Sequence, residues 1–233
     1  MPEPRVFRQS RFTTPPGGCE LVLVRHGESE PLVEGNPFPL VGGHGDPALA
    51  PEGRAQAELV GERLSTEPIA AIYVTTLRRT HETAAPLAAR LGLTPMVEPD
   101  LREVHLGEWE AGLFRQKVAD RDPVALEMFA QQRWDVIPGA EPGEQFSARV
   151  RGAFDRIVAA HVDQCVMVVA HGGVIGEILA QVTGSRPWSF VGADNASISH
   201  VVAMPDRWVL RVFNDTSHLD HGLLVTQGGE QLL

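Results

Sequence analysis

Two histidines occur in the same context, each directly after a short apolar run. His26 follows residues 21–24 with only Arg25 between, and His171 follows residues 166–170. An imidazole can act as a nucleophile near neutral pH, and an arginine beside it can bind an anion. Ligands of open α/β sheets bind where strands end. We therefore expect both histidines at one edge of a sheet, where they would act on an anionic group.

The elements that must position these residues alternate along the chain. Apolar runs predict strands over residues 21–25, 71–75, 95–98 and 166–170, and a hairpin over 197–204 and 208–213. Helices are predicted from Pro51, from a cap at Thr76 to Gly92, near 122–134, over 146–158 and after His171. This order predicts an α/β fold with three layers, α/β/α, and a mostly parallel central sheet.

The chain is predicted to contain one domain. Residues 1–18 are rich in proline and glycine and are expected to form a flexible lead-in, residues 19–215 a single domain, and residues 216–233 a C-terminal tail. Residues 31–50 are also rich in glycine and proline and predict a long loop. We expect that loop to line the substrate entrance.

Composition narrows the class of protein. The 233 residues suffice for one α/β core, and the formal net charge of −10 argues against nucleic acid or an anionic membrane as partner. Two cysteines, no long apolar run and no apolar segment near the N-terminus fit a protein of the reducing cytoplasm. The expected partner is a small molecule.

Four segments in order resemble the histidine phosphatase superfamily, with its phosphoglycerate mutase-like fold. They are Arg25-His26-Gly27-Glu28, Thr76-Leu77-Arg78-Arg79-Thr80-His81-Glu82-Thr83-Ala84, Leu101-Arg102-Glu103-Val104-His105-Leu106-Gly107-Glu108-Trp109-Glu110 and Ala170-His171-Gly172-Gly173. Their spacing agrees from about residue 20 to about residue 215. The resemblance implies a metal-independent histidine acid phosphatase, a phosphoric monoester hydrolase that needs no cofactor.

The resemblance also implies roles for four side chains. His26 would be the nucleophile and form a phosphohistidine, and His171 would be a cationic donor to the transferring phosphoryl group. Arg25 and Arg79 would bind the phosphate oxygens, as a guanidinium does in bidentate fashion. Each of the histidines alone is more often structural than catalytic, but the combination favours catalysis.

The remaining roles are assigned in the same way. Glu103 would protonate the leaving alkoxide and then activate water, with Glu108 and Glu110 as competitors for that role. Gly27 and Gly172 would let the backbone approach the anion, with Gly172 in the phosphate site.

Two further residues are given supporting roles. Glu28 would orient His26 or its loop. Asn195 would support the site or form a turn near it. His81, His105 and Trp109 are expected to pack near the pocket rather than react.

Two differences from the mutases favour a phosphatase. The mutases carry Glu-Arg-His-Tyr-Gly where this chain has Glu103-Val104-His105-Leu106-Gly107, and an Arg-Arg pair where an ungapped comparison places Gln131 and Gln132. With fewer cationic side chains at these positions, the chain is expected to bind a doubly charged phosphoglycerate less well. Apolar residues in 31–50 and 108–140 favour an organic phosphate monoester with some apolar surface, or broad specificity.

Alternatives stay open at this stage. The chain could be a cofactor-dependent phosphoglycerate mutase or a non-catalytic phosphate-binding or regulatory module. A metal-dependent hydrolase is disfavoured because His26 and His171 lack ligands at metal-site spacing. His218 and His221, with Asp215 and Asp220, fit no standard zinc site, so no metal is predicted. A homodimer is left open, because dimers are common in this fold.

Overall fold

A six-stranded sheet forms the centre of the molecule in a computed structural model, which describes residues 5–219. The strand order is β5-β4-β6-β1-β7-β8. The strands are β1 (Cys19–Arg25), β4 (Ile69–Val74), β5 (Met96–Val97), β6 (Cys165–Ala170), β7 (Ile198–Ala203) and β8 (Trp208–Asp215). The first four of these are mutually parallel, β7 runs antiparallel to β1, and β8 antiparallel to β7. The carboxyl ends of β4, β6 and β1 therefore meet at one edge.

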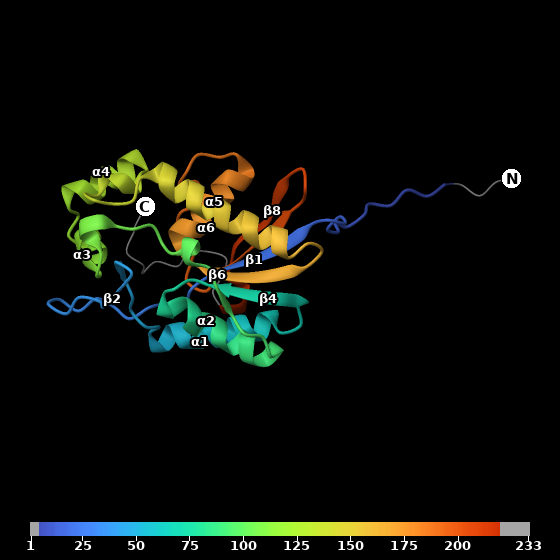
Figure 1. The fold of residues 1–233 in the computed structure, drawn as a ribbon, viewed down its shortest axis with the longest axis horizontal. Coiled ribbons are helices and arrows are strands. Elements are labelled where there is room, and N and C mark those ends of the chain that lie inside the picture. The colour runs from blue at the N-terminus through green and yellow to red at the C-terminus, as the bar shows by residue number, and fades with distance from the viewer. Residues whose placement is uncertain (1–4, 220–233) are drawn as a thin grey trace.

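Helices cover both faces of the sheet, as the sequence predicts (Figure 1). On one face lie α1 (Pro51–Leu64) and α2 (Arg78–Leu91), and on the other α5 (Gly143–Ala160) and α6 (Gly172–Thr183). Alternate side chains of β1 divide between the two layers. Leu21 and Leu23 pack with the α5 and α6 side, and Val22 and Val24 with the α1 side. A strand buried on both faces needs a continuous apolar run, which explains this segment of the sequence.

A smaller part of the chain folds beside the strand ends. It contains α3 (Leu113–Ala119) and α4 (Pro123–Gln131), packed around buried Trp109, Met128 and Ile137. The sequence predicts a helix near 122–134 but not α3, which has seven residues and none of them buried. The predicted loop at 31–50 contains a two-stranded hairpin, β2 (Leu40–Val41) and β3 (His44–Gly45).

One local prediction is wrong. Thr76 does not cap α2, because Leu77 is the N-cap residue and its N–H donates to Oγ1 of Thr75 at 3.2 Å. At the start of the predicted tail, Ser217–Leu219 form a 3₁₀ turn, and Leu219 is buried against the α1 side. The other proposed domain boundaries remain predictions. Within residues 5–219, no helix combines the length and the apolar character needed to cross a membrane.

Candidate active site

The two histidines lie together where β1 and β6 end. The N–H of His26 donates to the carbonyl of Ala170 at 3.0 Å, which joins the two strand ends. The imidazole rings are 5.2 Å apart between centroids and inclined by 61°. His26 is 7% exposed, whereas His171 is fully buried behind it. Adjacent parallel strands thus bring together residues that are far apart in the sequence.

The backbone determines which nitrogen of His26 is free. Nδ1 lies 2.7 Å from the carbonyl oxygen of Gly27. A carbonyl only accepts hydrogen bonds, so Nδ1 carries the proton and Nε2 of the neutral ring has a free lone pair. Burial lowers the pKa of His26 well below its ordinary value, and the charges of Arg79 and Arg25 lower it further. The ring is therefore neutral and nucleophilic at neutral pH.

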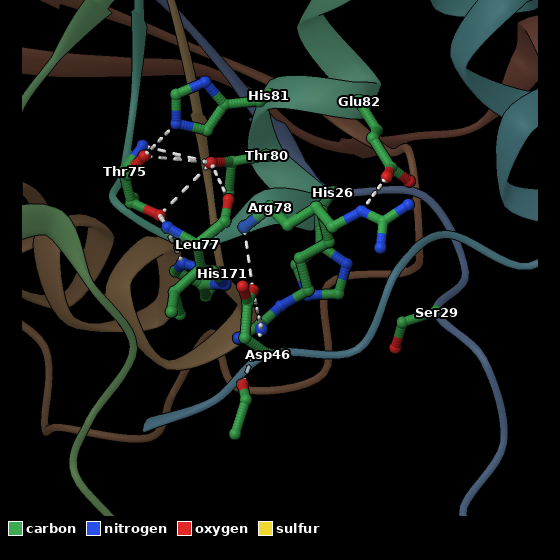
Figure 2. Close-up of polar contacts among 12 residues, drawn as sticks. His26, Ser29, Asp46, Thr75, Leu77, Arg78, Thr80, His81, Glu82 and His171 are labelled. Atoms are coloured by element: carbon green, nitrogen blue, oxygen red, sulfur yellow. Dashed lines mark hydrogen bonds and ion pairs between the residues drawn. The ribbon is translucent and has the colours of Figure 1, made fainter. Parts of the chain in front are cut away.

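The charge of His171 depends on its burial. Burial and then the charge of Arg79 lower its pKa well below the ordinary value, so the ring is neutral in the ligand-free protein rather than cationic. Its Nε2 lies 3.1 Å from Oγ1 of Thr75, which belongs to a hydroxyl network with Thr80 (Figure 2). When that hydroxyl donates to Nε2, the proton of a neutral ring lies on Nδ1. Nδ1 is buried and has no hydrogen-bond partner among the described residues.

Two predicted arginines border the same space. Arg25 ends β1 and donates from Nη1 to the carbonyl of Ala193. Arg79, in the first turn of α2, donates from Nη1 to the carbonyl of Gly45 at 2.9 Å and lies 3.9 Å from Asp46. Burial lowers the pKa of both guanidinium groups, that of Arg79 to about 10. Both arginines remain charged at neutral pH and can bind an anion.

A third arginine, which the sequence interpretation missed, completes the pocket. Arg115 in α3 donates to Oγ of Ser29 and to the carbonyl of Glu30, both at 2.7 Å. Its position depends on α3 lying over the loop that follows β1, and no spacing in the sequence indicated this. The pocket has a volume of about 140 Å³ and is lined by Arg25, His26, Ser29, Phe38, His44, Gly45, Pro47, Arg79, Glu103, Val104, Leu106, Trp109, Glu110, Gly112, Phe114 and Arg115.

Glu103 borders the pocket beside the first turn of α6. Its Oε1 accepts the N–H of Val104 at 2.9 Å, and its Oε2 accepts that of Gly173 at 3.0 Å. Its charge acts on the pKa of both Arg25 and Arg79. This places a carboxylate where it can exchange a proton with a group bound by the arginines.

The competing carboxylates are placed differently. Glu108 is exposed. Glu110 also lines the pocket, but its two oxygens accept the N–H groups of Leu106 and Gly45, each at 2.8 Å. Glu110 thereby links the hairpin containing β3 to the segment after Glu103, so its carboxylate has a structural role.

The two predicted glycines act in different ways. The N–H of Gly27 donates to Oγ1 of Thr83 at 3.0 Å, and a Cβ there would lie 2.5 Å from the carbonyl of Gly53. Gly27 is therefore required for close packing on α1, and its predicted approach to an anion stays a prediction. Gly172 begins α6 beside Arg25, where the first N–H groups of a helix favour anions.

Glu28 and Asn195 both hold the loop that contains His26. The carboxylate of Glu28 is exposed and makes no hydrogen bond to His26, contrary to one predicted role. Its backbone instead binds the side chain of Gln56 and the N–H of Ala50. Asn195 donates from Nδ2 to the carbonyl of His26 at 2.9 Å and so supports the site.

Other residues of interest lie outside the pocket. Gln131 and Gln132 line a separate groove with Trp134 and Trp188. His218 contacts the carbonyl of Ala196 through Nε2, and no metal-binding group of histidine, cysteine or acidic residues occurs among residues 5–219. His221 and Asp220 fall outside the described part of the chain.

Comparison with known proteins gives consistent matches. The profile of the histidine phosphatase superfamily (branch 1) matches residues 21–216. "Phosphoglycerate mutase-like protein 4" of Arabidopsis thaliana is 36% identical over 207 residues, 87% of either chain. "Metal-independent phosphoserine phosphatase" of the same plant is 33% identical over 205 residues, 86% of this chain and 83% of the relative. A mycobacterial glucosyl-3-phosphoglycerate phosphatase structure superimposes with a TM-score of 0.69 at 28% identity, covering 85% of this chain and 100% of that one.

Proposed function

The chain belongs to the histidine phosphatase superfamily, and we propose that it is a metal-independent phosphatase of small phosphate monoesters. The observation that carries the proposal is the state of His26. Its Nε2 has a free lone pair in a pocket bordered by Arg25, Arg79 and Arg115. A neutral nucleophile among fixed cations is what attack on a phosphate dianion requires.

The reaction has two steps. Nε2 of His26 attacks phosphorus and forms the P–N bond while the P–O bond to the alcohol breaks, and protonated Glu103 gives its proton to the leaving oxygen. The arginines and an N–H of His171 stabilise the charge on the phosphoryl oxygens. Glu103 then accepts a proton from water, which attacks phosphorus, breaks the P–N bond and releases phosphate.

The walls of the pocket support a substrate with some apolar surface beside its phosphate. Phe38, Leu106, Trp109 and Phe114 lie around the charged groups. Phosphoserine is the first natural ester to assay, because two relatives of comparable length carry the name phosphoserine phosphatase.

A mutase activity is the second candidate, because the relative at 36% identity carries a mutase-like name. The position of Gln131 and Gln132 argues against it. In an ungapped comparison they stand where the mutases have an arginine pair, so this chain lacks those two charges. We therefore expect release of phosphate to exceed interconversion of phosphoglycerates.

The test is phosphate release from p-nitrophenyl phosphate and phosphoserine in the presence of a chelator. We expect turnover by the wild type and none by His26→Ala. Turnover lost with the chelator and restored by a divalent metal would contradict a metal-independent mechanism. Absence of turnover on any monoester, with phosphate still bound, would instead identify a phosphate-binding module. Faster interconversion of phosphoglycerates than phosphate release would identify a mutase.

A further inference from the structure

Arg149 lies outside the pocket described above, and all of its hydrogen-bond donors are used. Its Nε and Nη2 bind the carboxylate of Glu141 at 2.6 and 2.8 Å. Nη1 donates to the carbonyls of Asp100 and Arg102 at 2.6 and 2.8 Å, and Nη2 to that of Glu103 at 2.9 Å. A guanidinium has five N–H groups in a rigid fork, and all of them are satisfied here.

The ion pair that anchors this arginine is itself half-buried. Burial tends to raise the pKa of Glu141, but the hydrogen bonds and charge of Arg149 outweigh this and lower it overall. The carboxylate of Glu141 is therefore charged at neutral pH, and it holds Arg149 on α5 in one orientation.

The carbonyls that Arg149 binds belong to backbone with little regular structure of its own. Asp100 lies in the 3₁₀ turn Pro99–Leu101, and Arg102 and Glu103 follow it before the next turn, Gly107–Trp109. No strand or α-helix contains Glu103. Ladder hydrogen bonds cannot fix such a segment. Among the described residues, the carbonyls of Asp100 and Arg102 accept side-chain hydrogen bonds from this guanidinium alone. The carbonyl of Glu103 also contacts Nε2 of His44 at 3.1 Å.

We propose that Arg149, held by Glu141, is a positioning residue for the proton donor Glu103. The proposal rests on the proposed function, because it assigns the arginine a part in the same reaction. Arg149 does not line the pocket, so it acts through the backbone. When the fork is removed, the carboxyl of Glu103 moves relative to the leaving oxygen, and a shift of about 1 Å in such a group can cost about 100-fold in rate.

A misplaced proton donor leaves a characteristic kinetic signature. Proton donation matters more as the leaving group becomes more basic, so phenyl phosphate depends on Glu103 more than p-nitrophenyl phosphate does. The value of kcat/KM covers the steps up to departure of the phenol and excludes hydrolysis of the phosphohistidine. The ratio of kcat/KM between the two esters therefore reports on proton donation by Glu103. A general loss of folded enzyme lowers both kcat/KM values by the same factor and leaves the ratio unchanged.

The experiment compares Arg149→Met and Arg149→Lys with wild type and with Arg151→Met. Arg151 is the matched control, because it lies on the same helix in an exposed pair with Asp155. We expect Arg149→Met to lose about 30-fold in kcat/KM on phenyl phosphate but less than about 5-fold on p-nitrophenyl phosphate. Arg149→Lys should resemble Arg149→Met, because a lysine restores the charge without the fork. Arg151→Met should match wild type.

Hydrogen exchange supplies a readout that needs no activity. The amides of Val104 and Gly173 donate to the carboxylate of Glu103, and we expect both to exchange faster in Arg149→Met. Equal losses on both esters, complete rescue by lysine or unchanged exchange would each overturn the proposal. If Arg149→Met does not fold, Glu141→Gln is used instead, because it weakens the ion pair that orients the guanidinium of Arg149. The same kinetic and exchange results then support or overturn the proposal. A wild type inactive on both esters and on phosphoserine would refute the proposed function, and the exchange rates would still decide whether Arg149 positions Glu103.

Discussion

Individual side chains in the site take their chemical state from burial and from single hydrogen bonds. The carbonyl of Gly27 fixes the tautomer of His26, and burial beside Arg79 keeps both His26 and His171 neutral. The sequence indicated that these residues meet, but not that burial lowers the pKa of His171 in the ligand-free protein. Its predicted role as a cationic donor to a bound phosphoryl group stays a prediction. A motif carries no information about desolvation, which is the main cause of the lowered pKa.

Neutral buried histidines make stability depend on pH. Below the ordinary histidine pKa of about 6.5, the unfolded chain binds protons at His171 that the folded protein does not, so stability falls as pH falls. We expect His171→Gln to reduce this slope by about 1.4 kcal/mol per pH unit. Urea unfolding between about pH 5 and pH 8 measures it. An unchanged slope in the variant would show that His171 is already charged in the folded state.

Gly173 leaves room for the carboxylate of Glu103. A Cβ there would lie 2.4 Å from Oε1, which is the far end of a flexible side chain. We expect Gly173→Ala to fold and to displace Glu103, with a loss of kcat of about 10- to 100-fold. Steady-state kinetics with phosphoserine, or with phenyl phosphate if phosphoserine is not a substrate, measures the loss. Gly143→Ala is the control, because nothing lies within 4 Å of its added Cβ. Full activity in Gly173→Ala would remove Glu103 from the reaction.

At the level of elements, the site depends on how the loop after β1 packs on the first turn of α1. A Cβ at Gly53 would lie 2.0 Å from the carbonyl of Glu28, and one at Gly27 would lie 2.5 Å from the carbonyl of Gly53. Both contacts involve backbone, which cannot move as a side-chain end can. The two glycines therefore determine how closely the loop containing His26 approaches α1.

This close approach predicts a large cost for a single methyl group. We expect Gly53→Ala to lower the free energy of unfolding by about 1–3 kcal/mol or more, because the helix and the loop must separate. Denaturant unfolding measures the loss. Gly152→Ala in α5 meets only Nη1 of Arg156 at 3.6 Å, and alanine favours a helix, so this control should be neutral or stabilising. Equal stability of the two variants would contradict the packing argument.

For the whole molecule, a cationic pocket lies in a protein of formal net charge −10. Three arginines face one small space, and each has its pKa lowered by burial. Burial concentrates their charge on a bound group, while the acidic remainder of the surface gives no general attraction for polyanions.

Phosphate should therefore stabilise the folded protein through this pocket. At 100 times its Kd, a ligand that binds only the folded state adds about 2.7 kcal/mol, and each kcal/mol raises Tm by about 2–4 °C at this chain length. We expect inorganic phosphate to raise Tm by about 5–10 °C at that concentration, and sodium chloride of equal ionic strength to have little effect. Thermal unfolding followed by circular dichroism measures this. An equal shift in Arg79→Ala would place the bound phosphate elsewhere.

The layers of the fold, and the meeting of His26 with His171, follow from sequence patterns alone. Continuous apolar runs predict strands buried on both faces, and their alternation with helices predicts a parallel sheet whose strand ends meet. That is enough to bring His26 and His171 together, because neighbouring parallel strands end at the same edge. The Glu103 segment was indicated only by its resemblance to a family motif, since it lies in irregular backbone.

Features that depend on contacts between distant segments became visible only in the folded chain. Arg115 reaches the pocket because α3 lies over residues 29–30, and α3 buries no side chain that would give it a periodic pattern. Arg149 holds the Glu103 segment through three carbonyls, and backbone groups have no signature in sequence. Sequence patterns report the faces that an element buries, whereas desolvation and backbone acceptors depend on which elements meet.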